Sequence, residues 1–231
     1  MNIFIAHING LKAELTPEES WHCAKVLRKK AGDAVHLIDG NGNFYDGVLD
    51  LVTERLCSVS ITRGPVEQTP SSYYLHLAIA PTKQIDRVEW MLEKAVEIGL
   101  HEVSFFSSHN SERKVVKMER LHKIIESAVK QSIQARIPKL NELIEFKEII
   151  KNQTSPQKLI AHCFDDPKKD IRAVNFRNKS TLVLIGPEGD FTETEVKLAK
   201  AQNFEAISLG HNRLRSETAG LYVCQAASLL G

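Results

Sequence analysis

The feature that most constrains the fold is the regular alternation of strand and helix patterns from Tyr73 to the end of the chain. Strands are predicted over residues 74–79, 103–106, 159–163, 181–185 and 206–209. Helices, each with apolar residues at helical spacing, are predicted over residues 85–98, 116–136, 194–201 and 218–230. Short apolar strands separated by helices are typical of a mostly parallel sheet covered on both faces. We therefore predict an α/β domain over residues 73–231.

The amino-terminal part has a different pattern, in which short strands are separated by turns. Strands are predicted over residues 2–8, 34–39, 44–51 and 55–62. A hairpin turn is predicted at Gly40–Asn43, because Gly and Asn tolerate positive φ. One helix interrupts these strands: Thr16 can cap it, Pro17 suits its first position, and it is expected to run to Lys29. These features predict a small β-barrel over residues 1–68, with a linker from Gly64-Pro65 to Ser72.

Several classes of protein are disfavoured by composition. No apolar stretch is long enough to span a bilayer, and the first residues lack the basic region and cleavage site of a signal peptide. The four cysteines are scattered and form no CxxC pair, which favours reduced thiols over a disulfide or a zinc site. We therefore expect a cytoplasmic protein with no membrane segment and no bound metal.

The basic residues are clustered although the formal net charge is only +1. Residues 112–139 contain eight Lys and Arg against three Glu, and a second group comprises Lys25 and Arg28–Lys30. Two local basic faces on a near-neutral protein suit one polyanionic partner better than a non-specific coat. A solvated helix face would produce the same run, so this pattern alone does not decide the partner.

The loop after the predicted strand 181–185 carries the first chemical signal. Its sequence is Gly186-Pro187-Glu188-Gly189-Asp190-Phe191, and a capping box from Thr192 to Glu195 then opens a helix. Ligands of open α/β sheets bind beyond the carboxyl ends of strands, where glycines let the backbone approach them closely. The loop matches neither a dinucleotide nor a triphosphate fingerprint, and a tight turn would also use Gly and Pro.

The second signal is the loop from Gly210 to Gly220, which lies between a predicted buried strand and an apolar terminal helix. It carries Arg213 and Arg215, whose burial near such elements is costly unless the guanidinium groups have partners. The partner is either a ligand or a carboxylate, and Glu188 and Glu217 are the candidates for an ion pair.

Together, GPEGDF and LGxxRLRSETAG resemble the paired cofactor loops of the small-subunit (16S) ribosomal RNA uridine-N3 methyltransferases, a branch of the SPOUT superfamily. Matches continue along nearly the whole chain, at His22 with Val26-Leu27-Arg28, Gly32-Asp33, Asp39-Gly40-x-Gly42, Lys94-x-x-Glu97-x-Gly99, Glu112-Arg113, Gln131-Ser132 and Pro138. The sequence departs from the family at three positions. Asp190 stands where a second Gly is usual, and Lys130 stands where Glu is common. Gln134 stands where Arg is frequent, and the nearest Arg is Arg136.

The resemblance implies a fold, a cofactor and a substrate. The expected fold is a small PUA-like β-barrel followed by an α/β SPOUT domain whose carboxyl end threads through a loop as a trefoil knot. The expected enzyme is a homodimer that uses S-adenosylmethionine to methylate N3 of a uridine in 16S ribosomal RNA, on the assembled small subunit.

The resemblance also implies site residues. The cofactor-binding residues would be Ile185, Gly186, Pro187, Glu188, Gly189, Leu209, Gly210, Asn212, Leu214, Arg215 and Thr218. For catalysis, Arg215 and then Arg213 are the candidates to stabilise negative charge on the uracil oxygens, and Glu188 or Glu217 to assist removal of the N3 proton. The RNA-binding candidates are Arg28, Lys29, Lys30, Arg113, Lys114, Lys117, Gln131 and Arg136.

Three alternatives stay open at this point. The same fold could methylate another base or a ribose oxygen. A non-catalytic RNA-binding or assembly factor would keep the barrel and the basic faces but is expected to have degenerate cofactor loops. A small-molecule α/β enzyme is disfavoured, because no nucleotide fingerprint, catalytic triad or metal cluster is present in the sequence.

Overall fold

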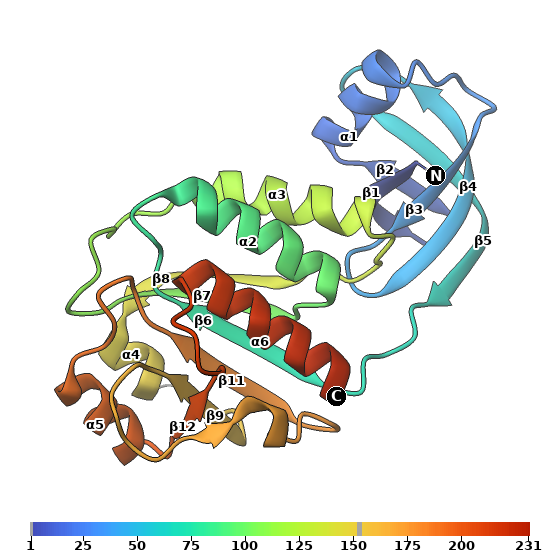
Figure 1. Ribbon diagram of the computed structural model, residues 1–231. Helices are drawn as coiled ribbons and strands as arrows, with labels where there is room; N and C mark the ends of the chain where they lie inside the picture. The colour runs from blue at the N-terminus through green and yellow to red at the C-terminus, as the bar shows by residue number, and fades with distance from the viewer. Residues whose placement is uncertain (1, 152–153) are drawn as a thin grey trace. The chain divides into compact units, whose positions relative to one another are not determined.

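The computed structural model describes residues 2–151 and 154–231 (Figure 1). The chain divides into two compact units. The first comprises Met1–Pro70 and Val129–Ile137, and the second comprises Ser71–Ala128 and Pro138–Gly231. The second part of the first unit therefore comes from a segment far along the chain, which adds Val129–Ile137 to the amino-terminal strands.

The first unit is a closed barrel with the strand order β1-β2-β5-β4-β3. Its strands are β1 (Ile3–Asn9), β2 (Lys12–Leu15), β3 (Ala34–Ile38), β4 (Asn43–Val52) and β5 (Cys57–Glu67). Alternate side chains such as Phe4, Leu37 and Val59 fill the interior, as the two-residue period of a strand requires. Parallel pairing of β1 with β3 closes the barrel, so the predicted barrel is confirmed.

Two local predictions about this unit are wrong. The helix is shorter than expected: α1 (Pro17–Trp21) continues as a π-helix, η1 (His22–Val26), and the backbone becomes left-handed at Arg28, with φ of 52°. The predicted start of the linker, at Gly64-Pro65, is also wrong, because β5 continues to Glu67, where it pairs with Asn43 of β4.

The second unit contains a seven-stranded sheet with the order β10-β12-β9-β11-β6-β7-β8. Its strands are β6 (Tyr74–Ile79), β7 (Glu102–Ser107), β8 (Lys139–Glu145), β9 (Gln157–Ala161), β10 (Lys169–Asp170), β11 (Ser180–Ile185) and β12 (Glu205–Ser208). Every neighbouring pair is parallel, which confirms the predicted sheet. The central strands β6 and β11 are almost completely buried, as expected for strands covered on both faces.

Helices lie on both faces of this sheet. They are α2 (Ile85–Ile98), α3 (Met118–Gln131), α4 (Phe146–Lys151), α5 (Glu193–Ala201) and α6 (Ser216–Leu230), with a short 3₁₀ turn η2 (Ile171–Ala173). Figure 1 shows α2 and α6 side by side on one face and α4 and α5 on the other. On the α4/α5 face, Phe106, Phe146 and Phe191 contact one another at the centre of an apolar cluster. On the other face α6 lies close to β6, since a Cβ at Gly220 would be 3.3 Å from Leu77.

The helix predicted over residues 116–136 ends early, at Gln131, because Ile133 adopts a left-handed conformation with φ of 56°. The strands β2, β8 and β10, the helix α4 and the turn η2 were not expected. Among residues 2–151 and 154–231, no helix is long and apolar enough to cross a membrane.

Candidate active site

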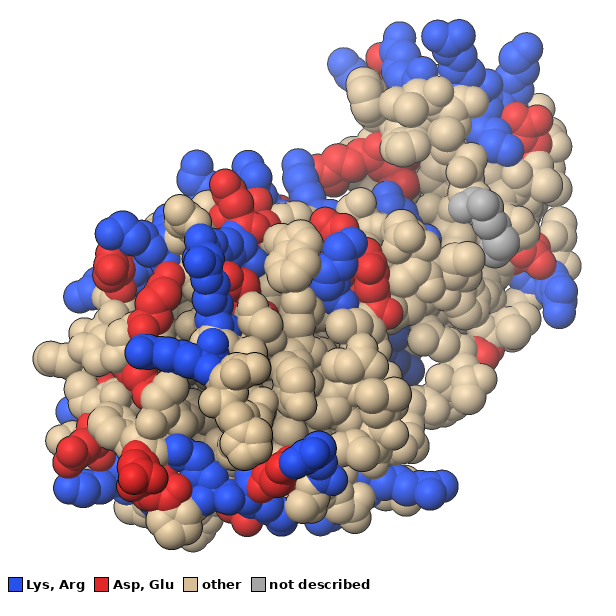
Figure 2. Space-filling model, viewed as in Figure 1, with Lys and Arg blue, Asp and Glu red and all other residues tan. Residues whose placement is uncertain are grey.

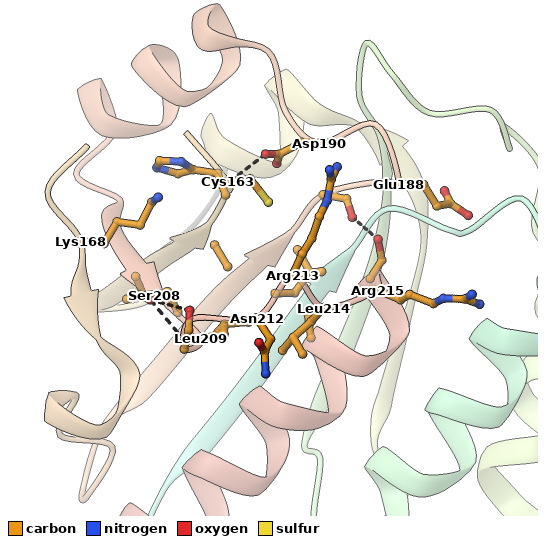
Figure 3. Close-up of a pocket in the computed structure, with 18 of the residues that line it drawn as sticks. Cys163, Lys168, Glu188, Asp190, Ser208, Leu209, Asn212, Arg213, Leu214 and Arg215 are labelled. Atoms are coloured by element: carbon orange, nitrogen blue, oxygen red, sulfur yellow. Dashed lines mark hydrogen bonds between the residues drawn. The ribbon is translucent and has the colours of Figure 1, made fainter. Parts of the chain in front are cut away.

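A pocket of about 570 Å³ opens at the carboxyl ends of three strands (Figure 3). These strands, β12, β9 and β11, are neighbours in the sheet, so the loops that follow them meet at one edge. The position agrees with the general rule for ligands of open α/β sheets. The lining residues are Ala161, His162, Cys163, Lys168, Ile185, Gly186, Pro187, Glu188, Asp190, Ile207, Ser208, Leu209, Gly210, His211, Asn212, Arg213, Leu214, Arg215, Ser216 and Ala219.

The loop after β11 is fixed by the loops that follow β6 and β7. Glu188 Oε1 accepts a hydrogen bond of 2.9 Å from the backbone N–H of Lys83. On the other side, Asn110 Nδ2 donates to the carbonyl oxygens of Gly189 and Asp190, each at 3.0 Å. Only a glycine fits at position 189 without displacement, since an added Cβ would lie 3.0 Å from Asn110 Cβ. The predicted cofactor loop is therefore a rigid turn supported by two other loops.

Asp190 joins the loop after β11 to the loop after β9. Its backbone is left-handed, with φ of 61°, which costs free energy for a residue with a Cβ. In this conformation Oδ2 accepts a 2.7 Å hydrogen bond from the backbone N–H of Cys163, and Oδ1 accepts one of 2.8 Å from the N–H of Phe191. The contact with Cys163, visible in Figure 3, spans two separate walls of the pocket.

The third wall is joined to the loop after β11 through the start of α6. Ser216, the first residue of α6, is buried and its Oγ donates a 2.8 Å hydrogen bond to the carbonyl oxygen of Gly186. Before it, Gly210 has φ of 110°, a conformation that favours glycine. Together with the Asp190 contact, this hydrogen bond connects all three pocket loops to one another.

The four predicted catalytic residues occupy different places. Arg213, Arg215 and Glu188 line the pocket, and Figure 3 shows Arg213 running across it toward Asp190 while Arg215 and Glu188 extend to the opposite side. Glu217 is not among the lining residues. It is 7% exposed, its Oε1 lies 3.7 Å from Arg87 Nη1 on α2, and its buried Oε2 has no hydrogen-bond partner among the described residues.

The pocket is lined by one thiol, Cys163, and by two imidazoles, His162 and His211. Burial raises the pKa of Cys163, and the Asp190 carboxylate raises it further, while Arg213 opposes the shift. The thiol is therefore protonated at neutral pH, and a thiolate nucleophile is not favoured here. Burial lowers the pKa of His162, although Asp166 partly offsets this, so the imidazole is held neutral.

Nine of the eleven predicted cofactor-binding residues line the pocket: Ile185, Gly186, Pro187, Glu188, Leu209, Gly210, Asn212, Leu214 and Arg215. Gly189 and Thr218 do not line it. Sequence reasoning missed the contribution of the loop after β9, namely His162, Cys163 and Lys168, and also missed Ser216. The end of the strand predicted over 159–163 was the available signal, because any loop at this edge of a parallel sheet is a candidate.

The predicted RNA-binding residues belong to both units. Arg28, Lys29, Lys30, Gln131 and Arg136 lie in the first unit, and Arg113, Lys114 and Lys117 in the second. Arg113 is half-buried, and its guanidinium donates to the carbonyl oxygens of Thr82 and Lys83 at 3.0 and 2.6 Å. Arg113 and Glu188 therefore both bind the backbone of the loop that follows β6, at residues 82–83. Lys114 and Lys117 are exposed.

Comparison with known families identifies both parts of the chain. A family described as "RNA methyltransferase domain" matches residues 69–228, which is more than half of the chain. A second, "RNA methyltransferase PUA domain", matches residues 15–62. This chain belongs to the RNA methyltransferase family. The barrel is accordingly PUA-like, and the α/β unit is a SPOUT methyltransferase domain.

Individual members of the family support the assignment over the whole chain. A crystal structure of a "probable rRNA-methyltransferase" from Porphyromonas gingivalis superimposes with a TM-score of 0.91 and 39% identity, covering 100% of this chain and 98% of that one. The ribosomal RNA small subunit methyltransferase E of Neisseria gonorrhoeae, bound to S-adenosyl methionine, gives 0.86 and 25%, covering 100% and 98%. The Bacillus subtilis protein of the same name is 27% identical over 93% of this chain and 88% of its own length.

Proposed function

We propose that this methyltransferase transfers the methyl group of S-adenosylmethionine to N3 of a uridine in 16S ribosomal RNA of the small subunit. Relatives named for methylation of small-subunit ribosomal RNA match the chain over most of its length, and one such relative was crystallised with S-adenosyl methionine. The observation that carries the proposal for this chain is the pocket built by three loops, two of them hydrogen-bonded to the loop after β11, and lined by Arg213 and Arg215.

The pocket suits the cofactor in size and in chemistry. A volume of about 570 Å³ lies within the usual range for small-molecule sites. Ile185, Leu209 and Leu214 supply apolar walls for an adenine ring, and Gly186 and Gly210 leave backbone groups accessible to polar atoms. When bound, S-adenosylmethionine supplies an electrophilic methyl group on a sulfonium. The trefoil knot, which the resemblance also implies, stays a prediction.

The arginines have the chemistry needed at the reacting base. Uracil N3 lies between two carbonyl groups, so loss of its proton spreads negative charge onto the oxygens. A guanidinium beside those oxygens stabilises that charge without being deprotonated itself. We assign this role to Arg215, with Arg213 as the second candidate. Arg215 is preferred because it extends to the same side of the pocket as Glu188, the candidate proton acceptor (Figure 3).

Glu188 is the better candidate for the proton acceptor. Its Oε1 is fixed by the N–H of Lys83, so the carboxylate is held in one orientation. No hydrogen bond engages Oε2 within the described part of the chain, and the side chain is exposed at the pocket, so Oε2 can face a substrate. Glu217 faces Arg87 instead, and we assign it a positioning role at the start of α6.

The RNA would be held by cations outside the pocket. Exposed basic residues in both units, among them Arg28, Lys30, Lys114 and Lys117, suit contacts to phosphates, which position RNA without reading its sequence. Reaching N3 requires an unpaired or extruded base, at a cost of a few kcal/mol, on the order of what such contacts can offset. Recognition by RNA shape fits an assembled small subunit as the substrate.

We also propose that the enzyme is a cytoplasmic homodimer. Trp90 on α2 and Tyr222 and Leu229 on α6 are exposed, and these helices pack side by side. Figure 2 shows a stretch poor in charged side chains over α6. A second copy covering this face would bury the apolar side chains. Sedimentation should give a dimer mass that Tyr222→Glu converts to a monomer, whereas a monomeric wild type would contradict the proposal.

The test is methyl transfer from labelled S-adenosylmethionine to small ribosomal subunits from cells lacking this gene, with the product mapped by mass spectrometry. A single 3-methyluridine is expected. Arg215→Ala and Glu188→Gln should each lower the rate at least about 100-fold, the scale for losing a transition-state donor or a general base. Lys197→Ala on α5, an exposed residue outside the pocket, is the matched control. A methyl group found on another base or on ribose would contradict the assignment of uridine N3 as the target. If the protein neither transferred a methyl group nor bound S-adenosylmethionine, a non-catalytic RNA-binding factor would be favoured.

A further inference from the structure

The short helical segment of the barrel carries an exposed tryptophan that the methyl-transfer chemistry does not use. Trp21 ends α1 and is 53% exposed. The segment docks on the barrel through other side chains: Cys23 is fully buried, and Ser20 Oγ donates to the Leu15 carbonyl oxygen at 3.4 Å and accepts from the Cys57 N–H at 3.0 Å. Trp21 is therefore not needed to attach the segment, and its ring is available on the outer side.

A single exposed apolar side chain is ordinary, but the neighbours of Trp21 are not. Lys25 follows one turn later, and Arg28, Lys29 and Lys30 follow the end of η1. Figure 2 shows Lys and Arg side chains gathered over the α1 part of the barrel unit. Lys25 is paired with Glu54 at 2.8 Å, but Arg28 and Lys30 are exposed and form no ion pair within residues 2–151 and 154–231.

The turn that carries these cations is held in a defined shape. The backbone N–H of Lys29 donates to the carbonyl oxygen of Cys23 at 3.0 Å, and that of Lys30 donates to Asp33 Oδ2 at 2.9 Å. Arg28 is left-handed, with φ of 52°, which turns the chain sharply after the helix. The cations are thus presented from a fixed backbone on the segment that follows Trp21, which lowers the entropy lost when they bind a ligand.

We propose that Trp21 is a stacking platform for an unpaired RNA base and that Arg28 and Lys30 contact the phosphates on either side of it. This inference rests on the proposed function, because it assumes an RNA substrate. Unpaired bases stack on exposed aromatic rings, and cations beside the ring neutralise the backbone. A protein partner is less suited to this segment, since its exposed large apolar side chains, Trp21 and Val26, are followed by Arg28 and Lys30, which form no ion pair among the described residues.

The test measures binding of a fluorescein-labelled 12-nucleotide oligouridylate and of an RNA duplex of the same length. Trp21→Ala should weaken oligouridylate binding about 5- to 100-fold, the range for loss of one stacked base, and should affect the duplex by less than about two-fold. Trp21→Tyr should retain most of the affinity because it keeps an aromatic face. In a Trp90→Phe background, where Trp21 is the remaining tryptophan, the oligouridylate should quench the fluorescence.

Salt dependence separates stacking from charge. Trp21→Ala should leave the slope of log K against log salt unchanged, whereas Lys30→Ala should reduce it by about 0.7. Equal weakening of oligouridylate and duplex by Trp21→Ala, or no weakening of either, would overturn the proposal. Loss of association with a protein partner while RNA binding is retained would overturn it as well. Calorimetry of S-adenosylmethionine binding to the wild type and to Trp21→Ala separates this proposal from the proposed function. The stacking proposal predicts the same Kd for both proteins, and no binding to the wild type would count against the proposed function alone.

Discussion

Asp190 offers the sharpest single perturbation of the pocket, because the structure gives it opposing effects on stability and on ligand binding. Replacing it by glycine removes the hydrogen bonds to the N–H groups of Cys163 and Phe191, at 2.7 and 2.8 Å. Hydrogen bonds to a charged group contribute about 1.5 kcal/mol or more, and the Phe191 contact is local, so we take the loss as about 2 kcal/mol. Glycine also relieves the left-handed backbone at φ 61°, which returns about 1 kcal/mol.

The expected net change in the free energy of unfolding for Asp190→Gly is therefore a loss of about 1 kcal/mol, or a fall in Tm of about 2–4 °C for a chain of this size. The effect on the cofactor should be larger. Without the contact to Cys163, the loop after β9 must be ordered when the ligand binds. A cost of about 1.4 kcal/mol for that ordering corresponds to a tenfold higher Kd for S-adenosylmethionine.

Calorimetry and thermal unfolding, measured on the same preparations, test both numbers. Asn178→Gly is the matched control: Asn178 is also left-handed, with φ of 57°, is exposed, and does not line the pocket, so its replacement reports the backbone effect alone. The control should not lower Tm and should leave Kd unchanged. If Asp190→Gly, like the control, failed to lower Tm and left Kd unchanged, the assignment of Asp190 as a residue that joins two pocket loops would be refuted.

Two further predictions concern other hydrogen bonds of the second unit. Ser216→Ala removes the hydrogen bond to the Gly186 carbonyl oxygen, so it should lower the free energy of unfolding by about 1 kcal/mol and raise the Kd for the cofactor. Thermal unfolding and calorimetry measure the two effects. Unchanged values would show that Ser216 does not join the start of α6 to the loop after β11. Glu102 has a pKa below its ordinary value: burial alone would raise it, but hydrogen bonds from Asn141, Tyr74 and Lys139 and the charge of His76 outweigh burial. A carboxyl group with a lowered pKa stabilises the fold at pH values above its unfolded pKa, which is near 4.3, and this stabilisation is lost as the pH falls through the folded pKa. Glu102→Gln should therefore flatten the fall in the free energy of unfolding on acidification, measured by urea unfolding. An unchanged acid profile would contradict this.

The parts of the fold that sequence predicted are those with a strong local signal. The strand β11 ends in the apolar run Leu182–Ile185, and β6 is apolar from Leu75 to Ile79 apart from His76. The helix α2 has buried residues at helical spacing and stops at Gly99 in a left-handed conformation. The edge strand β8 was missed because its apolar residues, Leu140, Leu143 and Ile144, do not follow the two-residue period of a half-buried strand. The early end of α3 at Gln131 was missed because nothing local distinguishes a left-handed Ile133 from a helical one.

The site was predictable to the extent that its residues are consecutive. The glycine-containing loops after β11 and β12 were identified from their composition and spacing, and both lie at the same edge of the parallel sheet, with β9 between the two strands. The contribution of Cys163 was not visible, because its contact with Asp190 joins residues that are 27 positions apart. Likewise, the orientation of Glu217 toward Arg87 depends on how α6 packs on α2, which spacing along α6 alone does not determine.

The most direct test of the central claim is the position of the methyl group on small-subunit RNA after reaction with the wild type and with Arg215→Ala. One 3-methyluridine per subunit is expected with the wild type. With Arg215→Ala almost none is expected, although that variant should keep the wild-type Tm and should bind S-adenosylmethionine with an affinity within a few-fold of the wild type. Full methylation by Arg215→Ala, or a wild-type product methylated at a position other than uridine N3, would contradict the claim.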